Sequence, residues 1–234
     1  MKRGHPMFPL GTVFVPGDAV SLRVFEDRYV AMVKDLLASD SASMEFGTVL
    51  IDKGSEVGGA DRRRSVGVNV RVTQCEVSGT GGFLLVGVAI QRLEILKWRP
   101  DAPYPIAEVK PIEDPKSSVE AISRLARVAQ LLRSLLVTML EEAGSTARDD
   151  EHDAGEFLLD KYLPARVSSS LRQVAAGRLE PSEADGASWS VIRCVPCGPY
   201  DKYSLLEAPT LMERITRTEH VVNHLWEMAE FRRQ

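Results

Sequence analysis

The sequence predicts an α+β protein: an antiparallel β-barrel with one helix over residues 1–112, followed by a helical subdomain over residues 113–234. Two observations lead to this fold class. Apolar residues alternate with polar or small ones through most of the first half, as in strands with one buried face. In the second half they recur every three or four positions, as in amphipathic helices. The composition changes at Glu113-Asp114-Pro115, where we place the boundary.

The first predicted elements are two strands joined by a turn, and then a helix. The apolar runs 13–15 and 20–24 flank Pro16-Gly17, a pair typical of a tight turn. After Phe25 the period becomes helical, with Asp27 as the expected N-cap. The expected buried face of this helix is Tyr29, Met32, Val33, Leu36 and Leu37.

Further strands are expected up to residue 112. The pattern predicts strands at 46–51, 66–72, 83–98 and 106–112, with a polar loop at 52–64 and a hairpin loop at 78–82. Because the alternation slips after Val72, we expect a β-bulge at Thr73 or Gln74. Gly87 is expected to bend the long strand. These strands with short connections predict a closed or partly closed barrel.

The second half is expected to be a helical bundle. Capping boxes at Ser117/Glu120 and Thr210/Glu213 predict the starts of two long helices. The first should run to about residue 143, and the second should bury Leu211, Ile215, Thr218, Val222, Leu225 and Ala229. Shorter helices are expected at 157–162 and 165–176, with a polar loop at 144–155. Three Pro and three Gly predict little helix in 177–203.

Composition bounds the function classes. A hydrophobic content of 44% and a net charge of -4 are ordinary for a globular protein and argue against a general nucleic-acid binder. The odd number of cysteines, three, favours a reducing compartment over a disulfide framework. We find no apolar run of about 18 residues that could span a bilayer. The expected location is the cytoplasm, with no membrane association.

No catalytic or metal-binding constellation is complete. Cys194 and Cys197 have the spacing of half a zinc site or a redox pair, but the other ligands are missing. His220 and His224 share a helix face, yet the residue after His220 is not the Glu that a zinc protease needs. Ser168, Ser169 and Ser170 have no His or Asp at a diagnostic spacing. We therefore expect neither enzyme activity nor a metal or cofactor.

Two charged clusters could be structural or could bind a ligand. Glu26 and Arg28 flank the predicted helix start, where a fold-stabilising cluster is favoured over ligand contact. The basic run 62–64 could contact an acidic partner or nucleic acid, but a solvated loop is the simpler interpretation.

Three segments carry a family resemblance: FPLGTVFVPG at 8–17, VFEDRY at 24–29 and FGTVLIDKGSEVGG at 46–59. In this order and spacing they resemble the N-terminal substrate-binding domain of the Lon ATP-dependent proteases. The matching residues are Phe8, Pro9, Leu10, Gly11, Pro16, Gly17, Phe25, Glu26, Arg28, Tyr29, Phe46, Gly47, Glu56, Val57 and Gly58. The resemblance implies a pseudo-barrel like that of PUA domains and a following helical subdomain. A Lon protease also needs a phosphate loop, G-x-x-x-x-G-K-[ST], which this sequence lacks, so we expect a stand-alone domain without the ATPase and peptidase modules.

The function that the resemblance implies is non-catalytic binding of exposed or unfolded polypeptide segments. The expected site is a groove between the β domain and the helices, with strand addition at a barrel edge as one mode. Candidate contact residues are Tyr29, Glu56, Val57, Gly58, Gly59, Trp98 and Tyr104, although Trp98 and Tyr104 could equally cap the core. The alternatives are a PUA-like RNA- or nucleotide-binding module, for which a basic groove with exposed aromatics would be expected, and an adaptor that recruits clients to a separate protease.

Overall fold

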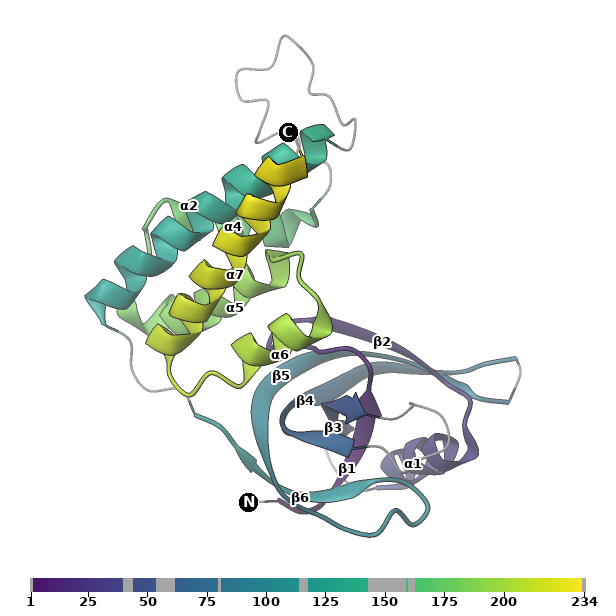
Figure 1. Ribbon diagram of the computed structural model, residues 1–234. Helices are drawn as coiled ribbons and strands as arrows, with labels where there is room; N and C mark the ends of the chain where they lie inside the picture. The colour runs from purple at the N-terminus through teal and green to yellow at the C-terminus, as the bar shows by residue number, and fades with distance from the viewer. Residues whose placement is uncertain are drawn as a thin grey trace. The chain divides into compact units, whose positions relative to one another are not determined.

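The computed structural model describes residues 2–39, 44–53, 62–79, 81–113, 118–142, 159 and 163–232. The chain divides into two compact units, Met1–Glu113 and Asp114–Gln234. Among the described elements, the first unit holds the strands and helix α1, and the second holds the other helices (Figure 1). The predicted α+β class is confirmed.

The first unit is built on a six-stranded sheet that closes on itself. Its elements are β1 (Lys2–Leu10), β2 (Ala19–Val24), α1 (Asp27–Ala38), β3 (Glu45–Lys53), β4 (Arg62–Val77), β5 (Phe83–Trp98) and β6 (Ile106–Pro111). The strand order is β2-β5-β4-β3-β1-β6, and β5 also pairs with β6. This last pairing closes a ring of β5, β4, β3, β1 and β6, with β2 attached outside it on β5.

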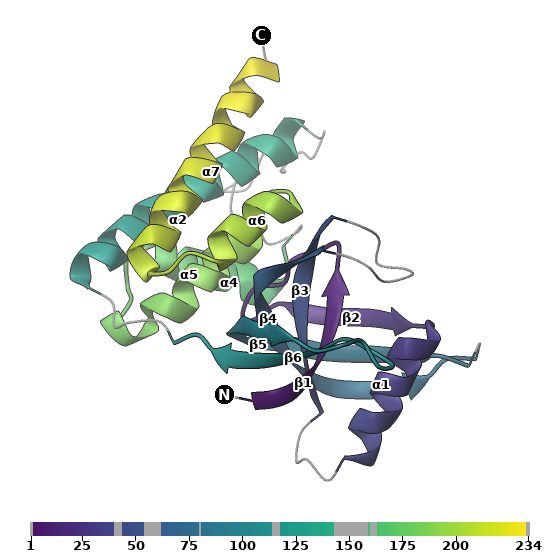
Figure 2. The same cartoon turned by 60° about the horizontal axis from the view of Figure 1, so that its bottom comes forward.

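One strand pair departs from the antiparallel prediction. β1 and β3 run parallel, with Met7 opposite Gly47 and Leu10 opposite Leu50, and Figure 2 shows the two strands side by side. Parallel neighbours need a long crossover connection, and here β2 and α1 lie between β1 and β3 along the chain.

The predicted turn is confirmed, but the strand expected before it is wrong. The Asp18 amide donates to the Val15 carbonyl oxygen at 3.0 Å, and Gly17 has a φ of 88°, which glycine adopts without strain. Residues 13–15 form no strand. The Val15 amide instead donates to the Asp18 carboxylate at 2.8 Å. The strand lies earlier, in β1, where Pro6 and Pro9 obscure the pattern.

Helix α1 buries its apolar face against the sheet, beside which it lies in both views (Figures 1 and 2). Tyr29, Met32, Val33 and Leu36 are buried as predicted, whereas Leu37 is exposed. The predicted N-cap is wrong by one residue. Glu26 occupies that position, in an extended conformation and without a side-chain cap hydrogen bond.

The β4–β5 hairpin forms as predicted, but β4 is longer than the predicted strand: it begins at Arg62, within the segment 52–64 predicted to be a loop, and ends at Val77. β5 has the predicted bounds, and the β4–β5 register shifts between Val72 and Gln74, which confirms the bulge. The Ser78 amide donates to the Gly82 carbonyl oxygen at 2.8 Å across the hairpin end.

The second unit is a bundle around α2. Its described elements are α2 (Val119–Glu142), α4 (Ala165–Ala175), the 3₁₀ turn η1 (Pro181–Glu183), α5 (Ala184–Cys194), α6 (Pro199–Leu206) and α7 (Leu211–Arg232). Ser118 caps α2 by accepting from the Ala121 amide, and Thr210 caps α7 by accepting from the Glu213 amide, each at 3.2 Å. The predicted cap Ser117 lies outside the described residues, as do the loop at 144–155 and most of 157–162. No helix in the described ranges is long and apolar enough to cross a membrane.

The prediction of little helix in 177–203 is wrong. Two helices form there because the prolines precede them instead of interrupting them. Pro181 lies in η1 just before α5, and Pro199 is the first residue of α6, where a missing N–H costs nothing. The buried side of α5 includes Ala184, Ala187, Val191 and Ile192, which keeps helical spacing.

A buried arginine joins α7 to α5. Arg214 is fully buried, and it donates to Asp185 at 2.6 Å and to Ser188 at 2.9 Å. Its guanidinium lies 3.8 Å from the ring centroid of Trp189. Hydrogen bonds and ring contact together offset the cost of burying the charge.

Candidate functional site

Three of the seven predicted contact residues, Tyr29, Trp98 and Tyr104, lie in the described part of the chain. Glu56, Val57, Gly58 and Gly59 lie outside the described residues. Tyr29 is 2% exposed and Tyr104 is 8% exposed, so neither ring offers much area to a ligand. The Tyr104 hydroxyl donates to Asp35 at 2.9 Å. Trp98 is half-buried, and the Arg63 guanidinium lies 4.4 Å from the centroid of its ring.

Four of the residues that carry the family resemblance form a contact cluster with Tyr29: Phe8, Glu26, Arg28 and Phe46. The Tyr29 ring stacks on Phe8 with centroids 3.8 Å apart and an interplanar angle of 8°, and Phe46 lies 6.3 Å from Phe8. Arg28 covers the Tyr29 ring at 4.5 Å and pairs with Glu26 at 3.0 Å. These contacts support the fold-stabilising interpretation of Glu26 and Arg28 over ligand contact.

The basic run 62–64 is paired with acidic residues. Arg62 and Arg64 both reach Asp52, at 3.3 and 2.6 Å. Arg63 donates two hydrogen bonds to the Asp101 carboxylate in a bidentate arrangement, at 2.6 and 3.2 Å. The run therefore belongs to β4 and its ion pairs, and its charge is compensated locally instead of forming a basic surface for a phosphate backbone.

The cysteine pair has the environment of structural thiols. Cys194 is buried at the end of α5, and its Sγ donates to the Ser190 carbonyl oxygen at 3.3 Å. Burial raises the pKa of Cys194 to about 11 and also raises the pKa of Cys197. A redox or metal-binding thiol needs a lowered pKa. His220 and His224 are exposed on α7, and no group of three or more potential ligands gathers anywhere in the described chain.

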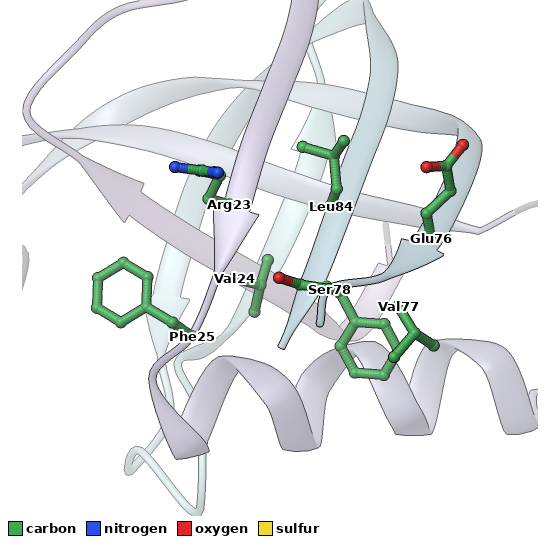
Figure 3. Close-up of a pocket in the computed structure, with 8 residues that line it drawn as sticks. Arg23, Val24, Phe25, Glu76, Val77, Ser78 and Leu84 are labelled. Carbon is green, nitrogen blue, oxygen red and sulfur yellow. The ribbon is translucent and has the colours of Figure 1, made fainter. Parts of the chain in front are cut away.

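One pocket in the first unit is formed by the end of β2 and the β4–β5 hairpin. It has a volume of about 440 Å³ and lies where β2 ends beside the tip of the β4–β5 hairpin (Figure 3). Phe25 and Val77 lie on opposite sides of it, 70% and 78% exposed, with Arg23 on the Phe25 side and Glu76 on the Val77 side. We call it the Phe25–Val77 pocket. Its lining is Arg23, Val24, Phe25, Glu76, Val77, Ser78, Phe83 and Leu84.

The strand register explains how these side chains come together. Arg23 is opposite Leu84 on β5, and Leu84 is opposite Glu76 on β4, so the three form one row across the sheet. Phe25 and Val77 follow at the strand ends. A Cβ at Gly82 would collide with the Val24 carbonyl oxygen, so only glycine lets the hairpin tip lie this close to the end of β2.

The chemistry of the pocket suits binding rather than catalysis. Five of its eight lining residues are apolar, and its charged groups are one arginine and one glutamate. Among its eight described lining residues, neither a histidine nor a cysteine is present to act as base or nucleophile. Such a pocket can hold an apolar side chain whose polar neighbours meet Arg23 or Glu76.

Most of this pocket was missed by the sequence analysis. The sequence singles out Phe25 only as a residue of the family motif, and it does not single out Val77. The sequence does contain a local signal for these two residues. Phe25 follows the alternating run of β2 and Val77 ends the run of β4, so neither residue is needed to complete the buried face of its strand.

Comparison with known proteins agrees with the fold. Residues 5–224 match the family described as the ATP-dependent protease La (LON) substrate-binding domain. A crystal structure of a Lon N-terminal domain protein from Xanthomonas campestris aligns with a TM-score of 0.54 at 22% identity, covering 92% of this chain and 96% of that one. The N-terminal domain of a Mycobacterium avium complex Lon protease aligns with a TM-score of 0.52 at 18% identity, covering 94% and 98%.

Curated relatives match over a shorter length. Lon protease 2 of Myxococcus xanthus is 28% identical over 140 residues, and Lon protease of Anaeromyxobacter dehalogenans is 26% identical over 140 residues. Each match covers 58% of this chain but only 17% and 16% of the relatives. Because the family match extends over nearly the whole sequence, the chain belongs to the Lon substrate-binding domain family.

Proposed function

We propose that this chain is a non-catalytic module that binds exposed, unfolded segments of other polypeptides at the Phe25–Val77 pocket. One observation carries the proposal: two large apolar side chains, 70% and 78% exposed, flank a hollow of about 440 Å³. Single exposed apolar residues are common, but a concave apolar site is typical of ligand binding. The family's description as a substrate-binding domain of a protease supports a polypeptide as the ligand.

The physical gain comes from removing apolar surface from water. Covering a Phe or Val side chain contributes roughly 1.5–3 kcal/mol when burial is complete. Contacts of this kind depend little on sequence, which suits a module that meets many clients. Delivery of those clients to a separate ATP-dependent protease, in the cytoplasm, is the cellular role that we propose.

The first experiment compares two ligand classes at physiological salt. Fluorescence anisotropy measures binding of the purified protein to a permanently unfolded polypeptide, reduced and carboxymethylated α-lactalbumin, and to a mixed-sequence single-stranded RNA. We expect saturable binding to the polypeptide alone. Salt-sensitive binding to the RNA alone would overturn the proposal, because that dependence reports phosphate contacts.

Matched variants assign the binding to the pocket. Phe25→Ser and Val77→Ser are each expected to weaken polypeptide binding about tenfold or more, since an apolar contact of roughly 1.4 kcal/mol or more is lost. Phe231→Ser and Val119→Ser are the controls, because these residues are of the same types, are 79% and 72% exposed, and lie in the second unit. An equal loss of affinity in the controls would show that the polypeptide binds nonspecifically to exposed apolar residues and is not recognised by the pocket.

A further inference from the structure

β2 has one paired side and one open side. It pairs with β5 along its whole length, from Ala19 opposite Val88 to Val24 opposite Phe83. In the described part of the chain it has no second strand neighbour, and it is the first strand in the sheet order. An edge strand presents a row of backbone N–H and C=O groups that a further strand can pair with.

The hydrogen-bond phase shows which groups point outward. The Ala89 amide donates to the Asp18 carbonyl oxygen at 2.9 Å, and a Cβ on Gly82 would collide with the Val24 carbonyl oxygen, so the carbonyl groups of Asp18 and Val24 both point towards β5. Bonded positions alternate along an antiparallel ladder, so the backbone N–H and C=O groups of Val20, Leu22 and Val24 point towards β5. The N–H and C=O groups of Ala19, Ser21 and Arg23 therefore point away from the sheet.

This open edge is accessible and leads to the pocket. The side chains of Ala19, Ser21 and Arg23 are exposed, and the first two are small. Natural edge strands are commonly protected by prolines, bulges or several charges, whereas Arg23 is the one charged residue in β2. The row of outward groups ends at Arg23, which lines the Phe25–Val77 pocket.

We propose that a client segment binds as an added β-strand on the open edge of β2, bonding to the outward groups of Ala19, Ser21 and Arg23, while one of its apolar side chains enters the Phe25–Val77 pocket. This inference rests on the proposed function and specifies its mode. Backbone pairing ignores sequence, and the pocket selects for an apolar residue at one end of the segment.

Charge adds a second preference. Neither Arg23 nor Glu76 forms an ion pair within the described residues. A client residue beside Arg23 on the added strand is a cross-strand neighbour, where opposite charges attract and like charges repel. The segment that fits is therefore extended, with an apolar anchor and an acidic or neutral residue next to Arg23.

Backbone hydrogen exchange of the whole chain, measured by NMR with and without the unfolded α-lactalbumin, tests the binding mode directly. Amides of Ala19, Ser21 and Arg23 should exchange about tenfold or more slowly when the polypeptide is bound, since each gains a hydrogen bond. Amides of Val20, Leu22 and Val24 already bond to β5 and should change little. Unchanged exchange at the three outward amides at saturation overturns the inference.

A proline variant gives an independent readout. Ser21→Pro removes an outward N–H, a position where an edge strand tolerates proline, and Ser21→Ala keeps that N–H. Polypeptide binding should weaken about tenfold in Ser21→Pro and remain within about twofold in Ser21→Ala. Circular dichroism and the thermal midpoint verify that both variants are folded. If Ser21→Pro does not fold, the exchange experiment on the unaltered chain still tests the inference.

The outcomes separate the two proposals. If the polypeptide binds and Phe25→Ser weakens it, but Ser21→Pro binds like Ser21→Ala and the outward amides stay unprotected, the pocket binds clients without strand addition. If the unaltered protein shows no saturable polypeptide binding, the proposed function itself fails. Protection that alternates along β2 supports both.

Discussion

At the scale of single residues, Tyr104 shows how a predicted contact residue can serve the fold. Its hydroxyl donates to Asp35 at 2.9 Å and so joins the segment before β6 to α1. Burial, and then the hydrogen bond and charge of Asp35, raise the pKa of Tyr104 from 10.0 to about 12. The neutral hydroxyl is thus favoured in the folded state.

We predict a pH-dependent stability effect for Tyr104→Phe. Because the folded-state pKa is the higher one, the contribution is complete below about pH 10 and is lost as the pH rises from about 10 to about 12. The variant should lose about 1 kcal/mol of unfolding free energy at pH 8. The difference in unfolding free energy between the unaltered protein and the variant should be smaller at pH 11. Urea unfolding of both proteins at the two pH values measures this. A gap that widens with pH would contradict the assigned hydrogen bond.

The contacts of Arg214 predict which of two substitutions destabilises the protein more. Arg214 is fully buried, whereas the Asp185 side chain is 43% exposed. Asp185→Ala leaves a buried guanidinium without its carboxylate and should cost about 3 kcal/mol. Arg214→Met leaves a carboxylate that water can reach and should cost less. Chemical denaturation measures the loss of unfolding free energy in each variant. A larger loss in Arg214→Met would show that packing of the arginine stem contributes more to stability than its charge.

Sequence patterns predicted which residues are apolar and buried, but not which polar residues join them. Arg214 falls between Leu211 and Ile215 on the face that the α7 pattern marks as buried. Its partner Asp185 lies 29 positions away, in a segment predicted to contain little helix. Pairing at such a separation depends on tertiary packing, which periodicity does not report.

At the scale of elements, a glycine inside α5 and a glycine at the start of α6 have opposite expected effects on stability. Gly186 lies within α5 and Gly198 is the N-cap of α6, and a Cβ would meet no heavy atom within 4 Å at either position. Gly186→Ala should stabilise the protein by about 0.5 kcal/mol, because alanine loses less backbone entropy in a helix. Gly198→Ala should destabilise it by a similar amount, about 0.5 kcal/mol, because alanine is a poor N-cap. Thermal unfolding of both variants measures the difference. Equal shifts in one direction would show that helix position does not decide the effect.

Elements with strong local patterns were predictable, and those whose pattern was broken were not. β5 and α4 match their expected bounds closely because their apolar period is uninterrupted. The strand before the Pro16-Gly17 turn was misplaced because β1 contains Pro6 and Pro9. Proline lowers the local signal for a strand, yet pairing with β3 and β6 holds β1 in the sheet.

At the scale of the whole molecule, the sequence pattern predicted a closed or partly closed barrel, but not which strands are neighbours or in which direction they run. Alternation indicates which face of a strand is buried, but not which strand lies beside it. The parallel β1–β3 pair and the additional β5–β6 pairing both depend on contacts distant in sequence. The candidate site has the same origin, since the Phe25–Val77 pocket forms where β2 ends against a hairpin more than 50 residues later.

The division into two units predicts that binding resides in the first. All lining residues of the Phe25–Val77 pocket and the open edge of β2 lie between residues 19 and 84, and the sheet around them closes within residues 1–113. The fragment 1–113 should therefore fold alone and bind the unfolded α-lactalbumin with a Kd within about threefold of the whole chain, a difference of less than about 1 kcal/mol.

The fragment 114–234 is the matched control. It has its own apolar core around α2 and exposes Phe231 and Val119, so it should fold without binding the polypeptide. Circular dichroism and cooperative thermal unfolding verify the folding of each fragment, and anisotropy measures binding. A folded 1–113 fragment that binds more than about tenfold more weakly than the whole chain would mean that residues beyond 113 contribute directly to recognition, and the pocket alone would not account for the affinity.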